Sequence, residues 1–193
     1  MNPESFTWRS YEWSKFFNDE SIKRINELIE TDHVGVEDKD LGAKSNGKAI
    51  KNISSVKHIP YGKIKHLISD FIGYVYQVAN LDFGYVTFAP FDNLYLNFNT
   101  YEAGSKDEYP WHIDESRQAT NSIKLTLLIN LSTEPFTGGE FQLFPSGGAE
   151  DVPILLESGS AFMFKSHILH RVLPVTSGTR KTLTMFIYGP RFS

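Results

Sequence analysis

The sequence predicts an α+β fold that is mainly β, with a β-sandwich or jelly roll supported by N-terminal helices. Two observations lead to this prediction. Apolar residues recur at helical spacing in the first third of the chain, and after Asn80 the pattern changes to short apolar runs separated by Gly, Pro and Asp. Aromatic residues make up 14% of the chain, which favours β-rich packing. Helices followed by many short strands are typical of an α+β domain.

Two helices are expected before the pattern changes. The first begins after Asn18, because this capping residue and the acids Asp19 and Glu20 precede an apolar stripe. The second runs from about residue 61 to residue 79. The stripes comprise Ile22, Ile25, Leu28 and Ile29 in the first helix, and Ile64, Leu67, Ile68, Phe71, Val75 and Val78 in the second.

A polar segment, residues 38–51, separates these helices and contains Gly42 and Gly47. It is expected to be a loop, either a solvated connection or a lid over an active site. Residues 53–59 are expected to form a short strand that ends at Pro60, because proline cannot donate a backbone hydrogen bond to a sheet.

Six further strands are expected in the rest of the chain, at 94–101, 123–131, 140–143, 160–164, 170–175 and 180–188. The Gly-containing segments 137–139 and 176–178 fit hairpin or corner turns between them. We therefore expect residues 1–193 to be one domain, with residues 1–80 as mostly helical support and residues 81–193 as the jelly-roll core.

Composition excludes several kinds of chemistry. The chain has 193 residues and no cysteine, so disulfides, thiolate metal sites and a cysteine nucleophile are all excluded. A net charge of −4 disfavours broad binding to nucleic acid. No apolar stretch is long enough to cross a membrane, and the N-terminus shows no signal-peptide pattern, so we expect a cytoplasmic protein without a membrane partner. Any metal must be held by His, Asp or Glu.

The sharpest local motif is Trp111-His112-Ile113-Asp114. On an extended chain, residues two apart point to the same face, so His112 and Asp114 can present an imidazole nitrogen and a carboxylate oxygen to one metal ion. Taken alone the motif is weak, because His-x-Asp is common and is also compatible with a surface turn.

A third ligand must come from the other histidines, and His170 is the strongest candidate. It opens an expected strand whose alternation places His170 and Val172 on one face, whereas His167 lies in the preceding turn. Two His and one carboxylate occupy one face of an octahedron and leave three positions open. This arrangement suits non-haem Fe(II) that binds a chelating cosubstrate and O2 together.

Arg180 is the candidate anchor for a carboxylate on that cosubstrate. It lies ten residues beyond His170, across a turn, and a hairpin of that length is expected to return its strand beside the strand of His170. The guanidinium can then form a bidentate salt bridge with a carboxylate. The alternative is a surface arginine that follows a turn.

These residues resemble the Fe(II)/2-oxoglutarate-dependent dioxygenase superfamily, and within it the prolyl-hydroxylase-like branch. The resemblance spans roughly residues 94–188. It is carried by Tyr101-x-x-Gly104, by Tyr109-Pro-Trp-His112-Ile-Asp114, by the Gly138-Gly139-Glu140 turn with Phe144-Pro145, and by the segment from His170 through Pro174 and Gly178 to Arg180. The insert before Tyr109 is about two residues longer than the usual form.

The resemblance implies a double-stranded β-helix (jelly roll) and turnover of 2-oxoglutarate and O2 to succinate and CO2 as a substrate is oxidised. It makes His112, Asp114 and His170 the Fe(II) ligands and Arg180 the partner of the distal 2-oxoglutarate carboxylate. Further candidates for contact with 2-oxoglutarate are Tyr101, Thr182, and Asn130 or Leu128 where some relatives place a Tyr. Tyr101 is equally compatible with a packed barrel tyrosine.

The branch also implies a substrate class, hydroxylation of a protein or peptide side chain with proline as the leading candidate. Residues that flank the ligands are candidates for a substrate groove, or else for rim and packing positions: Tyr109, Trp111, Glu115 and Arg171. A free amino acid or another small molecule is the alternative substrate. A jelly roll that binds a metal or ligand without catalysis is the alternative of another class.

Overall fold

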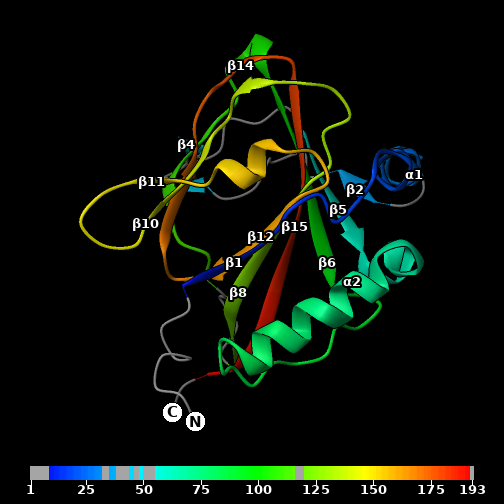
Figure 1. Cartoon of the computed structure of the whole chain (residues 1–193), viewed down its shortest axis with the longest axis vertical. Helices are drawn as coiled ribbons and strands as arrows, with labels where there is room; N and C mark the ends of the chain where they lie inside the picture. The colour runs from blue at the N-terminus through cyan, green and yellow to red at the C-terminus, as the bar shows by residue number, and fades with distance from the viewer. Residues whose placement is uncertain are drawn as a thin grey trace.

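Two antiparallel sheets face each other, and the helices cover the outer face of the larger sheet (Figure 1). The computed structural model describes residues 9–31, 35–37, 44–45, 48–49, 55–115 and 120–191. The major sheet has seven strands in the order β1 (Ser10–Trp13), β12 (Ala161–Lys165), β8 (Asn121–Asn130), β15 (Thr179–Pro190), β6 (Tyr95–Glu102), β5 (Ser55–Pro60) and β2 (Val36–Glu37). The minor sheet has four, in the order β11 (Glu150–Asp151), β10 (Phe141–Phe144), β13 (Leu169–Val172) and β7 (Tyr109–His112).

Smaller elements complete the description. Two short pairs join β14 (Val175–Ser177) to β9 (Thr137–Gly138) and β3 (Lys44–Ser45) to β4 (Lys48–Ala49). The 3-10 turns η2 (Ala103–Ser105) and η3 (Pro153–Leu156) lie in connections between the described strands. No helix among the described residues is long and apolar enough to cross a membrane.

Both predicted helices are confirmed. In α1 (Asp19–Glu30), Asn18 Oδ1 accepts from the Ser21 amide at 2.9 Å and closes the first turn. Helix α2 (Tyr61–Leu81) begins directly after Pro60, at the end of β5. The buried faces of both helices pack, together with the outward side chains of β6, β8 and β15, in one apolar cluster. These contacts hold the major sheet in place beneath the site.

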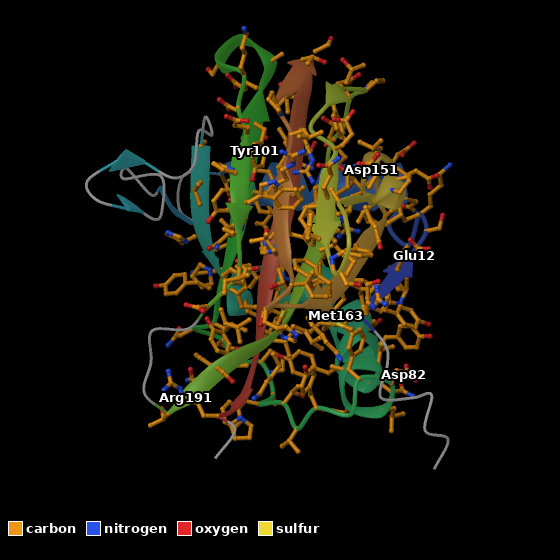
Figure 2. All side chains as sticks on the ribbon, turned by 90° about the vertical axis from the view of Figure 1, so that its left-hand side faces the viewer. Glu12, Asp82, Tyr101, Asp151, Met163 and Arg191 are labelled. Carbon is orange, nitrogen blue, oxygen red and sulfur yellow. The ribbon has the colours of Figure 1, made fainter. Side chains whose placement is uncertain are left out.

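A second apolar cluster lies between the two sheets, and the candidate site lies at its polar edge. It includes Val56 and Tyr101 of the major sheet and Phe141 and Leu143 of the minor sheet. In Figure 2, Tyr101 lies near one end of β6 and Met163 lies further along the major sheet. The strand alternation thus sends one set of side chains toward the helices and the other set into the space between the sheets.

The N-terminal third contains more β-structure than the sequence indicated. β1 and β5 are strands of the major sheet, so this sheet is not confined to residues 81–193. The four residues of β1 are too few for a recognisable alternation, and only pairing with β12 identifies them as a strand. The segment expected to be a loop, residues 38–51, lies outside the described residues except for the short β3–β4 pair, so neither a solvated connection nor a lid is tested.

The expected pairing of the Arg180 strand with the His170 strand is wrong. β13 pairs with β10 and β7 in the minor sheet, whereas β15 pairs with β6 and β8 in the major sheet. Between them, β14 pairs with β9 and carries the chain across the corner from one sheet to the other. His170 and Arg180 therefore face the same interior space from opposite sheets.

Candidate active site

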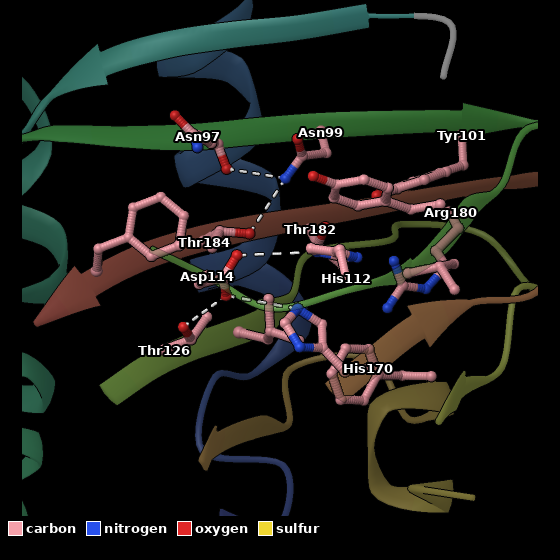
Figure 3. Close-up of a pocket in the computed structure, with 15 residues that line it drawn as sticks. Asn97, Asn99, Tyr101, His112, Asp114, Thr126, His170, Arg180, Thr182 and Thr184 are labelled. Carbon is pink, nitrogen blue, oxygen red and sulfur yellow. Dashed lines mark hydrogen bonds and ion pairs between the residues drawn. The ribbon is translucent and has the colours of Figure 1, made fainter. Parts of the chain in front are cut away.

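A cavity opens between the two sheets and collects the polar side chains that both sheets point inward. Figure 3 shows the three candidate ligands at its centre, with Arg180 to one side and Asn97 and Asn99 on β6. His112 comes from β7, Asp114 follows that strand directly, and His170 comes from β13. The backbone pairing places His170 directly opposite His112.

The ligand atoms of these three residues lie within 4.8 Å of one another. Asp114 Oδ1 is 3.8 Å from His112 Nε2, and Asp114 Oδ2 is 3.4 Å from His170 Nε2. All three side chains are largely buried. Three inward donors this close together can share one divalent ion, with two nitrogens and one oxygen in its shell.

Backbone carbonyls orient both imidazoles. His112 Nδ1 is 2.8 Å from the Pro110 carbonyl oxygen, and His170 Nδ1 is 2.9 Å from the Ile168 carbonyl oxygen. A carbonyl oxygen only accepts, so each Nδ1 carries the hydrogen and each Nε2 keeps a lone pair facing Asp114. This is the tautomer that a metal site requires.

Aromatic packing fixes the two rings further. Tyr109 stacks on His112 with ring centroids 3.5 Å apart, and Phe164 meets His170 edge-on at 4.8 Å. Burial lowers the pKa of His170, so at neutral pH its imidazole is uncharged and available as a ligand. The apolar packing therefore supports metal binding and disfavours a competing proton.

Asp114 is held from the major sheet by Thr126, a residue of β8. Thr126 Oγ1 donates to Asp114 Oδ2 at 2.7 Å, and the Asp114 amide donates to the Ser166 carbonyl at 3.0 Å. One carboxylate oxygen thus has a fixed neighbour while the other faces His112.

We expect Thr126→Val to weaken Fe(II) binding about 10- to 100-fold, because a ligating carboxylate that loses its supporting hydrogen bond is less well oriented. Anaerobic Fe(II) titration of the folded variant measures the effect. Thr133→Val, at an exposed position beyond the same strand, serves as the control. Unchanged Fe(II) affinity in Thr126→Val would show that Thr126 does not support the ligand.

Arg180 is fully buried at one end of the cavity, and its charge is uncompensated there. Neither Nε nor Nη2 has a hydrogen-bond partner among the described residues. The ring centroid of Tyr101 lies 5.4 Å from Arg180 Cζ. Burial raises the pKa of Tyr101 to about 12, so this phenol stays neutral and cannot supply the missing anion. A buried, unpaired guanidinium is costly unless an anion joins it.

The turn at Gly139 makes room for this arginine. Gly139 has φ +67°, and a Cβ there would lie 2.9 Å from Arg180 Cδ and 3.0 Å from a Val175 methyl. Any residue other than glycine would be strained at this positive φ, and its Cβ would crowd the aliphatic part of the Arg180 side chain. In the sequence this glycine is only part of a turn motif, and its packing role becomes visible only in three dimensions.

The donor set fits Fe(II), and the unpaired guanidinium fits a carboxylate of 2-oxoglutarate. A pocket that offers two imidazoles, one carboxylate and a separate buried cation matches a cosubstrate that chelates a metal at one end and carries a carboxylate at the other. Thr182 lies between these ends on the inner face of β15. Tyr101 and Thr182 both line the cavity, a position compatible with contact to 2-oxoglutarate.

Asn130 does not line the cavity. Asn130 Nδ2 donates to the Leu155 carbonyl, and Asn130 Oδ1 accepts from the Ser132 backbone amide, so both polar atoms of this side chain are used in structural hydrogen bonds. Leu128 lines the cavity instead. Of the four proposed groove residues only Tyr109 lines the cavity.

The remaining groove candidates are on the outer face of the minor sheet or in solvent. Arg171 Cζ lies 4.5 Å from the Trp111 ring centroid, and Arg171 Nε donates to Gln142 at 2.7 Å. These contacts tie β7, β13 and β10 together behind the histidines. Glu115 is exposed. Because alternate residues of a strand point to opposite faces, the neighbours of inward ligands necessarily point outward.

Sequence reasoning missed several residues that line the cavity, namely Asn97, Asn99, Thr126, Thr184 and Phe186. A signal was present. Thr126 interrupts the apolar run of β8, and polar residues recur at every second position of β15 from Arg180 to Thr184. Polar side chains on one face of otherwise buried strands indicate a site between the sheets.

Comparisons with known proteins agree with this geometry. Residues 96–188 match the family model of the 2OG-Fe(II) oxygenase superfamily. A PKHD-type hydroxylase of Shewanella oneidensis is 30% identical over 96 residues, which cover 47% of this chain and 41% of that protein. One of Acaryochloris marina is 36% identical over 87 residues, which cover 44% of this chain and 37% of that protein. The match thus spans less than half the length of these relatives.

Solved structures share the fold across almost the whole chain. A Pseudomonas putida prolyl-4-hydroxylase has a TM-score of 0.66 at 14% identity and covers 98% of this chain and 96% of its own. A Trichoplax adhaerens prolyl hydroxylase, solved with a hypoxia inducible factor peptide fragment, has a TM-score of 0.69 at 15% identity over 96% of this chain and 86% of its own. Residues 96–188, which contain every cavity-lining residue, thus match the 2OG-Fe(II) oxygenase superfamily model, and the jelly roll of the chain is similar to those of prolyl hydroxylases.

Proposed function

We propose that this chain is an Fe(II)- and 2-oxoglutarate-dependent dioxygenase that hydroxylates an unactivated C–H bond, most readily on a prolyl residue of a protein or peptide. The observation that carries the proposal is one cavity with a His112–Asp114–His170 cluster and a buried guanidinium that lacks an anion. A metal-binding module without catalysis has no use for the second feature.

The proposed roles follow from the positions of the side chains. His112, Asp114 and His170 would hold Fe(II), and Arg180 would bind the distal carboxylate of 2-oxoglutarate, with Tyr101 and Thr182 alongside. Fe(II) with 2-oxoglutarate and O2 supplies the oxidising chemistry when bound. The chain's own contribution is orientation and exclusion of water: carbonyls fix the imidazoles, Thr126 fixes the carboxylate, and aromatic rings shield the ligands.

The substrate class is supported by the relatives. The Trichoplax neighbour was solved with a peptide fragment, and several structural neighbours are prolyl hydroxylases. The identity with these structures is low, so the peptide and its residue are part of the proposal. We also propose that the described residues act as a single domain, in the cytoplasm.

Adding Fe(II) and 2-oxoglutarate to metal-free protein without oxygen tests the proposal. We expect a visible charge-transfer band from the chelate, and after admission of oxygen, formation of succinate with a mass gain of one oxygen atom in a prolyl peptide. Well-folded protein that binds Fe(II) but shows no band would instead identify a metal-binding module.

A further inference from the structure

The inner face of the major sheet is a floor of paired side chains, ordered from Arg180 toward the ligands. Arg180 pairs with Tyr101, Thr182 with Asn99, and Thr184 with Asn97 across β15 and β6. On the other side of β15, Phe186 pairs with Thr126, the residue that holds Asp114. Arg180 and Thr184 are four positions apart along β15, which corresponds to about 13 Å.

This order divides the cavity into two parts. Under the proposed function, an oxoacid anchored at Arg180 would lie along the rows of Tyr101 and Asn99 and reach toward the metal ligands. Asn97 lies in the next row, on β6, while Asp114 rests on β8 two strands away. The substrate would therefore occupy the space between Asn97 and the metal ligands.

Asn97 offers a hydrogen-bond donor to that space. Its side-chain oxygen accepts from His58 Nδ1 at 2.8 Å, and its backbone oxygen accepts from Asn99 Nδ2 at 3.3 Å. His58 neighbours Asn97 on the inner face of β5. No described residue accepts a hydrogen bond from Asn97 Nδ2. Asn97 is half-buried and lines the cavity. His58 thus holds the carboxamide so that its nitrogen remains available.

We propose that Asn97 is a specificity-determining residue whose Nδ2 donates to a carbonyl or carboxylate oxygen of the prolyl unit that is hydroxylated, with His58 as its positioning residue. This inference rests on the proposed function. A prolyl nitrogen in a peptide carries no hydrogen, so oxygen acceptors are the polar groups that the unit can present to the protein. A donor beside the open side of the metal is the complementary group.

Two probes separate the possible acceptors: an N-acetylated, C-amidated prolyl peptide, which has carbonyl oxygens only, and free L-proline, which has a carboxylate. Asn97→Asp keeps the shape and the oxygen that faces His58 but replaces the donor with an acceptor. We expect it to raise the KM of the effective probe about 10- to 100-fold, with a much smaller change in kcat, because the contact is made equally in the bound and transition states.

Control variants at Asn93 and His58 test whether the effect on the KM comes from the Asn97 Nδ2 donor. Asn93→Asp adds the same charge at an exposed position before β6 and is expected to leave the KM unchanged. His58→Phe frees the carboxamide and is expected to raise the KM less than Asn97→Asp, whereas His58→Gln restores a donor and part of the affinity. With oxygen excluded, the probe-induced change in the charge-transfer band gives the dissociation constant independently of turnover.

If Asn97→Asp raises the KM of the blocked peptide, the acceptor is a peptide carbonyl. If it raises only the KM of free proline, the acceptor is a free carboxylate. A wild-type KM in Asn97→Asp overturns the inference. So does wild-type protein that forms the band but binds neither probe. Absence of the band rejects the proposed function itself, and the inference with it.

Discussion

Replacing His170 with alanine is expected to abolish turnover and to weaken Fe(II) binding by more than 100-fold. Loss of an outer partner of a ligand typically costs about 10- to 100-fold in metal affinity, and removal of the ligand itself costs more. The remaining pair, His112 and Asp114, leaves the ion with two protein donors. Anaerobic titration with Fe(II), followed by the charge-transfer band with 2-oxoglutarate, measures the loss.

His167→Ala is the matched control, because His167 is an exposed histidine on the turn before the same strand. It should bind Fe(II) as the wild type does. Removal of the buried His170 side chain also leaves a hole beside Phe141 and Phe164, so thermal unfolding should be followed in parallel. A folded His170→Ala protein that still turns over 2-oxoglutarate would exclude His170 as a ligand.

Replacing Arg180 with leucine is expected to raise the KM for 2-oxoglutarate about 30-fold or more while Fe(II) still binds. Truncating one partner of a buried charge pair costs about 2–5 kcal/mol, and each 1.4 kcal/mol is tenfold in affinity. The variant should also lose the rise in unfolding temperature that 2-oxoglutarate confers on the Fe(II)-loaded wild type.

Arg180→Leu also has an expected effect on the unfolding temperature when no cosubstrate is present. Arg180 is buried and its Nε and Nη2 are unpartnered, so leucine removes an uncompensated charge and should not lower the unfolding temperature of the metal-free protein. Lys181→Met is the control: this neighbour on β15 points the other way and forms an ion pair with Glu30. An unchanged KM for 2-oxoglutarate in Arg180→Leu would refute the anchoring role.

Local chemistry explains what could be predicted from the sequence. The Asn18 cap, the apolar stripes of both helices and the alternation of β6, β8 and β15 depend on residues that are close together in the chain. The same holds for the spacing of His112 and Asp114. For these features, the period of the pattern already determines which face a side chain occupies.

Pairing between distant strands determined the rest. Sequence placed Arg180 beside His170 in one hairpin, but β14 crosses between the sheets and the two residues meet across the cavity instead. Asn130 and Leu128 both point inward on β8, and only the position of η3 decides that Asn130 bonds Leu155 while Leu128 lines the cavity.

The sequence by itself determined the type of fold, and it supplied the residues that we propose to bind a metal and an oxoacid. The tertiary structure alone decided that Thr126 supports Asp114, that Gly139 makes room for Arg180, and that Asn97 lines the cavity with its side-chain oxygen bonded to His58. The physical reason is that residue type and local period set what a side chain can do and which face it occupies. Which side chains meet depends on the register and order of strands far apart in the chain, which local periodicity does not encode.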